Sequence, residues 1–290
     1  MSQNELQDIQ AIDLNSIEAG QEFNYPDLKS TITLFFVYIL NTFIIAIPAV
    51  IIILGLNTLY FNSPLLKSLL NLLTYIATLL ITIRYVIKRS KKQQGYFPKI
   101  SFNKVQGWLI PVIIIGTLAL VIPLDWVSDL IPMPKSVQKF FEATFTKDIF
   151  SIITMVIAAP IMEEILCRGI ILRGLLKNYS PYKAILISAI FFGAIHLNPW
   201  QAIPASLGGL FLGWVYYKTQ SVIPGMIIHA TINITAALFL FLPNHQQDLL
   251  GLLGLPYYLV ACLVSIIVFT TTCVIINKKV LIIQKPINSF

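Results

Sequence analysis

Long apolar stretches separated by short polar ones make up most of the chain after residue 29. A helix that crosses a membrane needs about 20 mostly apolar residues. The fifth and sixth apolar stretches are short and separated only by Asn198, Pro199 and Trp200, so seven spans is the nearest alternative to the predicted eight. The eight predicted membrane-spanning helices lie at residues 31–56, 65–87, 106–124, 149–172, 183–198, 201–217, 222–242 and 253–277.

Composition supports this interpretation of the pattern. Of the 290 residues, 57% are hydrophobic and only 11% are charged, whereas soluble domains carry about 25% charged residues. The sequence therefore predicts an all-α polytopic membrane protein in contact with the lipid bilayer. The three cysteines, Cys167, Cys262 and Cys273, lie in apolar segments and are interpreted as small hydrophobic residues rather than a disulfide framework.

The placement of the positive charges predicts how the chain is oriented. Only four of the 20 Lys and Arg residues, Lys67, Lys135, Lys139 and Lys147, fall on the side opposite the other sixteen. Cytoplasmic loops carry an excess of Lys and Arg, so we expect a multi-pass protein of the cell membrane with both termini in the cytoplasm. The net charge of +7 reflects this orientation, and no nucleic-acid partner is expected.

The pattern divides the chain into five parts. Residues 1–29 form a polar, acidic leader without the basic start of a signal peptide. The four remaining parts are three membrane-spanning helices (30–124), an extracytoplasmic amphipathic segment (125–147), a segment that carries the candidate chemistry (148–242), and a last spanning helix with a basic tail (243–290).

Gly209 and Gly213 form a pair of small residues four apart, which predicts close helix packing.

Two adjacent carboxylates lie inside the fourth apolar stretch, at Glu163 and Glu164. A charged side chain at the centre of a bilayer costs roughly 2.5–3.5 kcal/mol or more, and intramembrane ionisable residues mark functional sites by default. Glu164 and Arg168 are four residues apart and can form an ion pair on one helix face. Glu163 points about 100° away around the helix and is free to act. The alternative is a purely structural salt-bridge network.

Two histidines occupy later apolar helices. His196 follows Phe192 by four residues, and His229 precedes Asn233 by four, so each pair shares a helix face. A single histidine in an apolar helix is often a hydrogen-bonded packing residue, but the combination with Glu163 favours a site. The third histidine, His245, lies in a polar loop and is expected to be solvated.

These residue types are suited to amide hydrolysis by either of two routes. A carboxylate and an imidazole can deprotonate a water molecule, while a second imidazole and a carboxamide stabilise an oxyanion. Alternatively, Glu163, His196 and His229 could bind zinc and leave one position open for water. The sequence leaves both routes open and predicts an active site in a cavity among the last five helices.

The three motifs together resemble those of the CAAX protease and bacteriocin-processing family, also called the Abi or type II CAAX prenyl endopeptidase family. They are Glu163-Glu164 with Arg168, Phe192 with His196, and His229 with Asn233, and the resemblance covers roughly residues 148–240. It implies an intramembrane endopeptidase that acts on a membrane-associated peptide or protein.

The resemblance also implies a role for each residue. Glu163 would activate water with help from His196, His229 and Asn233 would stabilise the oxyanion, and Glu164 and Arg168 would support the site. Bacterial members are linked to peptide maturation, bacteriocin self-immunity or surface-protein processing, and the many Ile, Asn and Lys residues suggest an AT-rich bacterial genome.

Two other classes of function compete with the protease. In a proton-coupled secondary transporter, Glu163 and the histidines would relay protons, but the paired, broken helices typical of such folds are not evident in the sequence. A catalytically silent immunity or binding protein is the second alternative, and the intact motif set argues against it.

Overall fold

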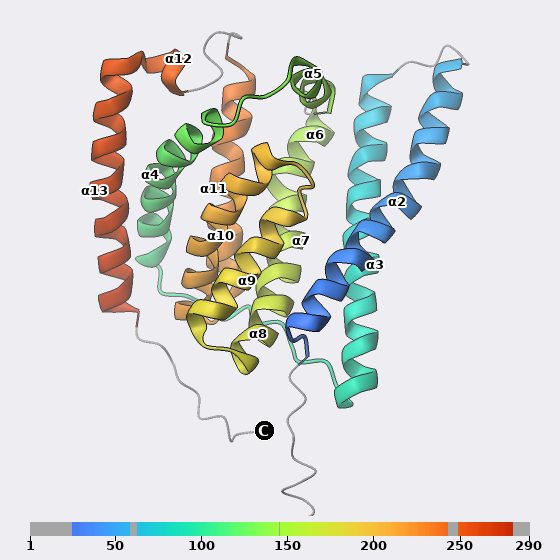
Figure 1. Ribbon diagram of the computed structural model, residues 1–290, viewed down its shortest axis with the longest axis horizontal. Coiled ribbons are helices and arrows are strands. Elements are labelled where there is room, and N and C mark those ends of the chain that lie inside the picture. Colours follow the sequence, from blue (N-terminus) through green and yellow to red (C-terminus); the bar gives the residue numbers. More distant parts are fainter. Residues whose placement is uncertain (1–24, 59–62, 145, 243–248, 281–290) are drawn as a thin grey trace, which may run out of the picture.

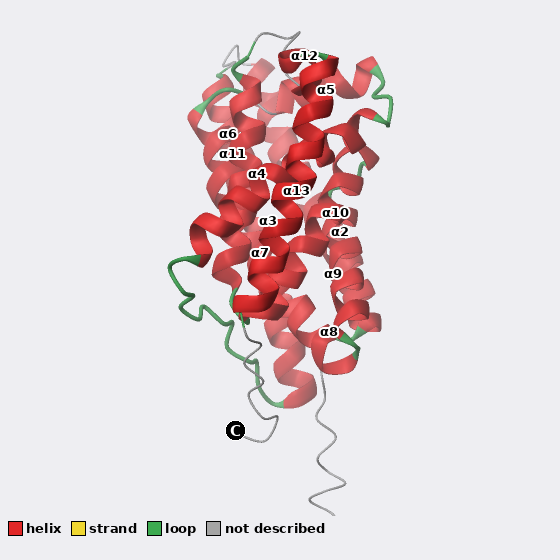
Figure 2. Cartoon of the chain, turned by 90° about the vertical axis from the view of Figure 1, so that its left-hand side faces the viewer, coloured by secondary structure: helices red, strands yellow, loops and turns green. Residues whose placement is uncertain are grey.

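The computed structural model describes residues 25–58, 63–144, 146–242 and 249–280, and all regular structure within these ranges is helical (Figure 2). The all-α class predicted from the sequence is therefore confirmed. The helices outside the region 149–178 are α2 (Leu28–Thr58), α3 (Pro64–Gln94), α4 (Leu109–Asp129), α5 (Lys135–Thr144), α9 (Pro181–Ala194), α10 (Pro199–Thr219), α11 (Val222–Leu240), α12 (Leu249–Leu253) and α13 (Leu255–Lys279).

Six helical stretches are long and apolar enough to cross a membrane, as expected for a polytopic membrane protein. They correspond to six of the eight predicted spans. The other two predicted spans also form helices, but α9 has only 14 residues and α10, although 21 residues long, falls below the hydropathy of the six. Each helix packs one face against the bundle and leaves apolar side chains of its other face exposed, among them Leu186 and Ile190 on α9 and Ile203 and Leu207 on α10.

The helix pair α2 and α3 lies along one edge of the bundle, and α4 and α13 lie along the other (Figure 1). Between these edges lies the part of the chain from residue 149 to residue 240. Its centre is the most buried part of the molecule, since Leu166, Ile171, Leu172 and Leu175 are fully buried. The predicted amphipathic segment 125–147 is divided between the end of α4 and the separate helix α5.

The helical stretch 149–178 alternates between α-helical and π-helical turns. π-Helical turns are rare and occur frequently at functional sites, because the extra residue changes which side chains and carbonyls face a neighbour. Its five pieces are α6 (Ile149–Ile153), η1 (Thr154–Ala158), α7 (Ala159–Glu164), η2 (Ile165–Leu172) and α8 (Arg173–Asn178).

Helices α9 and α10 cross at very short range. A Cβ added to Gly209 would lie 3.2 Å from Ala189 Cα, and one added to Gly213 would lie 3.1 Å from Ile185 Cγ2. A Cβ on Gly193 would collide with the Ser206 side chain. The close packing predicted from Gly209 and Gly213 is therefore confirmed, and it brings the backbone of α10 within reach of the centre of the bundle.

Basic residues gather where three helices end on one side of the bundle, the lower side in Figure 1. The last turns of α3, α8 and α13 carry Lys91 and Lys92, Lys177, and Lys278 and Lys279, respectively. These cations also complement the negative ends of the helix dipoles.

The predicted loop histidine His245 lies outside the described residues.

The first helical turn after the α5 segment depends on Asp148. Its Oδ1 accepts hydrogen bonds from the backbone N–H groups of Phe150 (2.9 Å) and Ser151 (3.2 Å), which makes it the N-cap of α6. Burial raises the pKa of Asp148, but hydrogen bonds from Ser68, Thr146 and Ser151 outweigh this effect, and the net pKa is lowered.

We expect Asp148→Ala to destabilise the protein by about 1 kcal/mol, because two backbone donors lose their acceptor. Ser180→Ala is the matched control, since Ser180 is an N-cap residue without a side-chain cap hydrogen bond. Thermal unfolding in detergent measures both.

The effect of Asp148→Ala should also depend on pH. Because the folded pKa is depressed, the stabilisation is present above the unfolded value of about 3.9 and is lost as the pH falls through the folded value. The difference between wild type and Asp148→Ala should therefore shrink in acid, and a pH-independent difference would contradict the assignment.

Candidate active site

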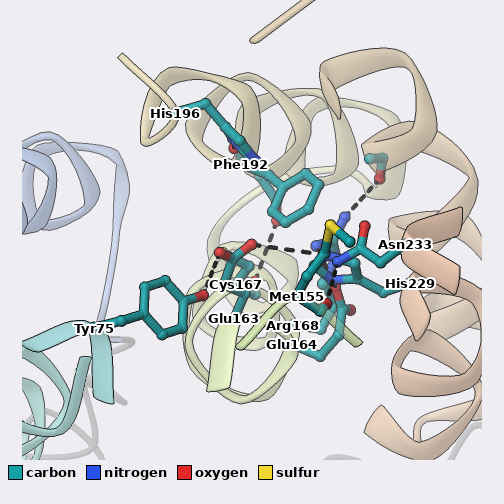
Figure 3. Close-up of polar contacts among 12 residues, drawn as sticks. Tyr75, Met155, Glu163, Glu164, Cys167, Arg168, Phe192, His196, His229 and Asn233 are labelled. Carbon is teal, nitrogen blue, oxygen red and sulfur yellow. Dashed lines mark hydrogen bonds and ion pairs between the residues drawn. The ribbon is translucent and has the colours of Figure 1, made fainter. Parts of the chain in front are cut away.

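The glutamate pair ends α7, between the two π-helical segments η1 and η2. Glu163 and Glu164 are both buried, with 7% and 0% of each residue's surface exposed. Figure 3 shows that side chains from α3, η1, α9 and α11 surround them. Two carboxylates are therefore buried in the bundle and need polar partners there.

Glu164 forms the predicted ion pair with Arg168. The Arg168 guanidinium donates to Glu164 Oε1 at 2.8 Å and to the Gly209 carbonyl at 3.1 Å, and it lies 4.4 Å from the centre of the Phe192 ring. Both charged groups are fully buried. Helix α10 therefore holds the pair through the Gly209 carbonyl, which comes close because Gly209 has no side chain at the crossing with α9. Helix α9 holds it through the face of the Phe192 ring.

His229 lies between the two carboxylates (Figure 3). Its Nδ1 is 3.3 Å from Glu164 Oε1, and its Nε2 is 4.0 Å from Glu163 Oε2. The ring edge also contacts Phe192, with the ring centroids 5.3 Å apart. Each nitrogen of one buried imidazole therefore faces a different glutamate, so the two carboxylates are connected through α11.

Glu163 has a polar partner that sequence reasoning missed. The hydroxyl of Tyr75, on α3, donates to Glu163 Oε1 at 2.5 Å. The other oxygen, Glu163 Oε2, is buried and has no hydrogen-bond partner among the described residues. A tyrosine in an apolar helix carries no spacing signal, and α3 lies outside every motif, so only the packing of α3 against this segment identifies Tyr75.

His196 takes part in the site only through Phe192. Its Nδ1 is 2.9 Å from the Phe192 carbonyl, and its ring contacts the Phe192 ring at a centroid distance of 5.5 Å. The two residues are in contact as predicted, but α9 ends at Ala194, so His196 lies beyond the helix and not on a helix face shared with Phe192. Within the described residues no hydrogen bond joins His196 to Glu163, His229 or Asn233. The Phe192 ring lies between the two histidines (Figure 3).

Asn233 is held by the first π-helical segment. Its Nδ2 donates to the Met155 carbonyl, within η1, at 2.7 Å. Asn233 lies one helical turn beyond His229 on α11, so both residues face the segment that carries the glutamates. The contact joins the backbone of η1 to α11.

The zinc set considered from the sequence does not fit this arrangement. Across the described residues, no group of three His, Cys, Asp or Glu side chains is placed to hold a metal ion. His196 Nδ1 faces the Phe192 carbonyl, and the Tyr75 hydroxyl donates a hydrogen bond to one oxygen of Glu163.

Comparison with known proteins shows that the residues of the three motifs lie within a segment that matches a known family. Residues 145–235 match the family described as "Type II CAAX prenyl endopeptidase Rce1-like", which is a protease family. Over 79 residues the chain is 32% identical to the UPF0177 protein YxdF of Lactococcus lactis subsp. lactis (strain IL1403), and this match spans 27% of the chain and 43% of that relative. No solved structure matches. The resemblance predicted from the three motifs is confirmed for this segment.

Arg168→Ala should strongly destabilise the protein, because it leaves Glu164 as a buried charge without its cation. Removing one partner of a buried pair costs about 3–5 kcal/mol. The yield of folded protein in detergent and its thermal unfolding measure the effect. Arg84→Ala, at an exposed position on α3, is the control and should behave like wild type; equal stability of both variants would contradict a structural role for the pair.

Gly225→Ala should also disturb Glu164, through steric contact. A Cβ at Gly225 would lie 2.6 Å from Glu164 Oε2, so α11 or the ion pair must move. The same change at Gly208, where the nearest atom is 3.6 Å away, is the control. We expect a lower unfolding temperature for Gly225→Ala only. Unchanged stability of this variant would show that α11 does not constrain Glu164.

Proposed function

We propose, on the premise that residues 145–235 form an Rce1-like domain, that this protein is an intramembrane endopeptidase. It hydrolyses a peptide bond in a membrane-associated peptide or protein. The observation that carries the proposal is the position of Glu163 Oε2, a buried carboxylate oxygen without a hydrogen-bond partner in the described structure, 4.0 Å from His229 Nε2. A water molecule between a carboxylate and an imidazole is positioned for activation.

The proposed reaction begins with Glu163 as general base. Oε2 takes a proton from the water molecule as the water oxygen attacks the scissile carbonyl carbon. The carbon–oxygen bond forms and the carbonyl oxygen becomes an oxyanion. Collapse of this intermediate breaks the carbon–nitrogen bond, and the proton held by Glu163 passes to the leaving amine. The same carboxylate therefore serves first as base and then as acid.

The remaining residues stabilise charge or hold the site. With a proton on each ring nitrogen, His229 would donate through Nδ1 to Glu164 and through Nε2 to the oxyanion. The Asn233 carboxamide would donate a second hydrogen bond to the oxyanion, since donors aimed at developing charge stabilise the transition state. Glu164 orients His229 through Nδ1, and Arg168 compensates its charge. We assign His196 the assisting role through Nε2, the nitrogen that the Phe192 carbonyl does not engage, which requires its ring to turn toward Glu163 when substrate binds.

The proposed location is the cell membrane, with both termini in the cytoplasm. The basic ends of α3, α8 and α13 on one side of the bundle support this orientation, since cytoplasmic segments carry excess Lys and Arg. We propose peptide maturation, bacteriocin self-immunity or surface-protein processing as the biological role. We also propose that the chain divides into five parts after residues 29, 124, 147 and 242, and that residues 148–242 form the catalytic core.

Glu163→Gln tests the function, because it keeps the shape of the side chain and removes the base. Cleavage of a set of lipid-anchored, fluorescence-quenched peptides by the protein in liposomes should fall by roughly 10²–10⁴-fold, the usual contribution of a general base. Glu142→Gln, on α5 and outside the matched segment, is the control and should retain wild-type activity.

Three outcomes would contradict the proposed mechanism or function. Full activity of Glu163→Gln would rule out Glu163 as the base. Uptake of a solute driven by a pH gradient, lost in Glu163→Gln and not accompanied by cleavage, would indicate a transporter. Protection of cells from a bacteriocin that survives Glu163→Gln would favour a catalytically silent immunity protein.

A further inference from the structure

The base of the proposed reaction is held by a residue from outside the matched domain. Tyr75 lies on α3, whereas the family match begins at residue 145. Its hydroxyl reaches across the helix boundary to Glu163 Oε1 at 2.5 Å, a short and strong contact for an O–H donor to a carboxylate (Figure 3). Helix α3, at the edge of the bundle, therefore contributes directly to the site.

This contact makes the two oxygens of Glu163 unequal. Oε1 accepts the Tyr75 hydroxyl, while Oε2 has no hydrogen-bond partner among the described residues and faces His229 Nε2 at 4.0 Å. The terminal torsion of a glutamate is broad and roughly two-fold. Without a fixed donor, either oxygen could face His229, and the carboxylate plane could rotate between the two arrangements.

We propose that Tyr75 is the positioning residue for the general base, so that its hydroxyl fixes Glu163 with Oε2 directed toward His229 and the attacking water. This inference rests on the proposed function. Misplacing a reacting group by about 1 Å can reduce a rate by about 10²-fold. A fixed carboxylate plane therefore contributes to the rate and not only to the satisfaction of a buried polar group.

The choice of tyrosine fits this task. A phenolic hydroxyl donates one hydrogen bond and carries no charge in its ordinary state. A Lys or Arg in the same place would add a second cation to a site where Arg168 is already fully buried, at a high cost in an apolar environment. It would also pair with Glu163 as an ion and make the carboxylate a weaker base. Tyr75 orients the carboxylate without neutralising it.

Tyr75→Phe is the direct test, because it removes only the hydroxyl. In liposomes, with the lipid-anchored, fluorescence-quenched peptides, we expect kcat to fall by about 10–100-fold with KM unchanged, since Tyr75 acts on Glu163 and does not touch the substrate. Tyr85→Phe, an exposed tyrosine on the same helix, is the matched control and should keep wild-type kcat. Thermal unfolding is measured in parallel on both variants.

Infrared difference spectroscopy provides a measurement that does not depend on activity. The spectrum of wild type minus Glu163→Gln isolates the carboxyl band of Glu163. The spectrum of Tyr75→Phe minus the double variant isolates the same band without the hydroxyl. A hydrogen bond to Oε1 predicts that the two bands differ in frequency, and the corresponding pair made with Tyr85→Phe should show no difference.

The outcomes separate this inference from the proposed function. If Glu163→Gln is inactive but Tyr75→Phe cleaves at the wild-type kcat, the function stands and the positioning role is wrong. If Tyr75→Phe has a lower unfolding temperature but its folded fraction keeps the wild-type kcat, the Tyr75 hydroxyl stabilises the fold and does not position the base. Coincident infrared bands would show that the contact itself is absent. If the wild type cleaves none of the peptides while the bands differ, the proposed hydrolysis fails and the contact remains.

Discussion

The structure is organised around the need to satisfy two carboxylates in an apolar bundle. Glu164 and Arg168 are fully buried, and their ion pair is acceptable only because further groups surround it. Arg168 uses the Gly209 carbonyl on α10 and the Phe192 ring on α9, while Glu164 contacts His229 on α11. A single charge pair therefore fixes three neighbouring helices relative to the segment that carries it. Two glycines belong to the same network, because the Gly209 carbonyl accepts from Arg168 and Gly225 leaves room for Glu164 Oε2.

The same network explains why the two adjacent glutamates differ in character. Glu164 meets both the Arg168 guanidinium and His229 Nδ1 through Oε1, which gives it a fixed orientation, while its Oε2 lies against Gly225 without a hydrogen-bond partner among the described residues. Glu163 shares His229 at a longer distance and is anchored from the opposite side of the site by Tyr75. One oxygen of Glu163 is thus left for chemistry. The π-helical turns on either side allow this arrangement, because η1 turns a carbonyl toward Asn233 while α7 keeps both glutamates near α11.

His196 shows how local structure can compete with a site. It lies just beyond the last turn of α9, where backbone carbonyls lack partners within the helix. Its imidazole satisfies one of them, the carbonyl of Phe192, and its ring packs on the same residue. Phe192 is therefore the common neighbour of Arg168, His196 and His229. The motif formed by Phe192 and His196 therefore packs against the buried charges through the Phe192 ring, in addition to the chemical role proposed for His196.

The sequence by itself determined the all-α membrane class, the positions of the helices, the Glu164–Arg168 pair and the close packing at Gly209 and Gly213. These features depend on hydropathy and on the fixed spacing of residues along one helix, which is local information. The tertiary structure alone decided which helices meet. It brought Tyr75 to Glu163, placed His229 between two carboxylates and left the His196 ring at the Phe192 carbonyl. Such contacts depend on how helices distant in sequence pack, and residue spacing within a helix carries no record of that packing.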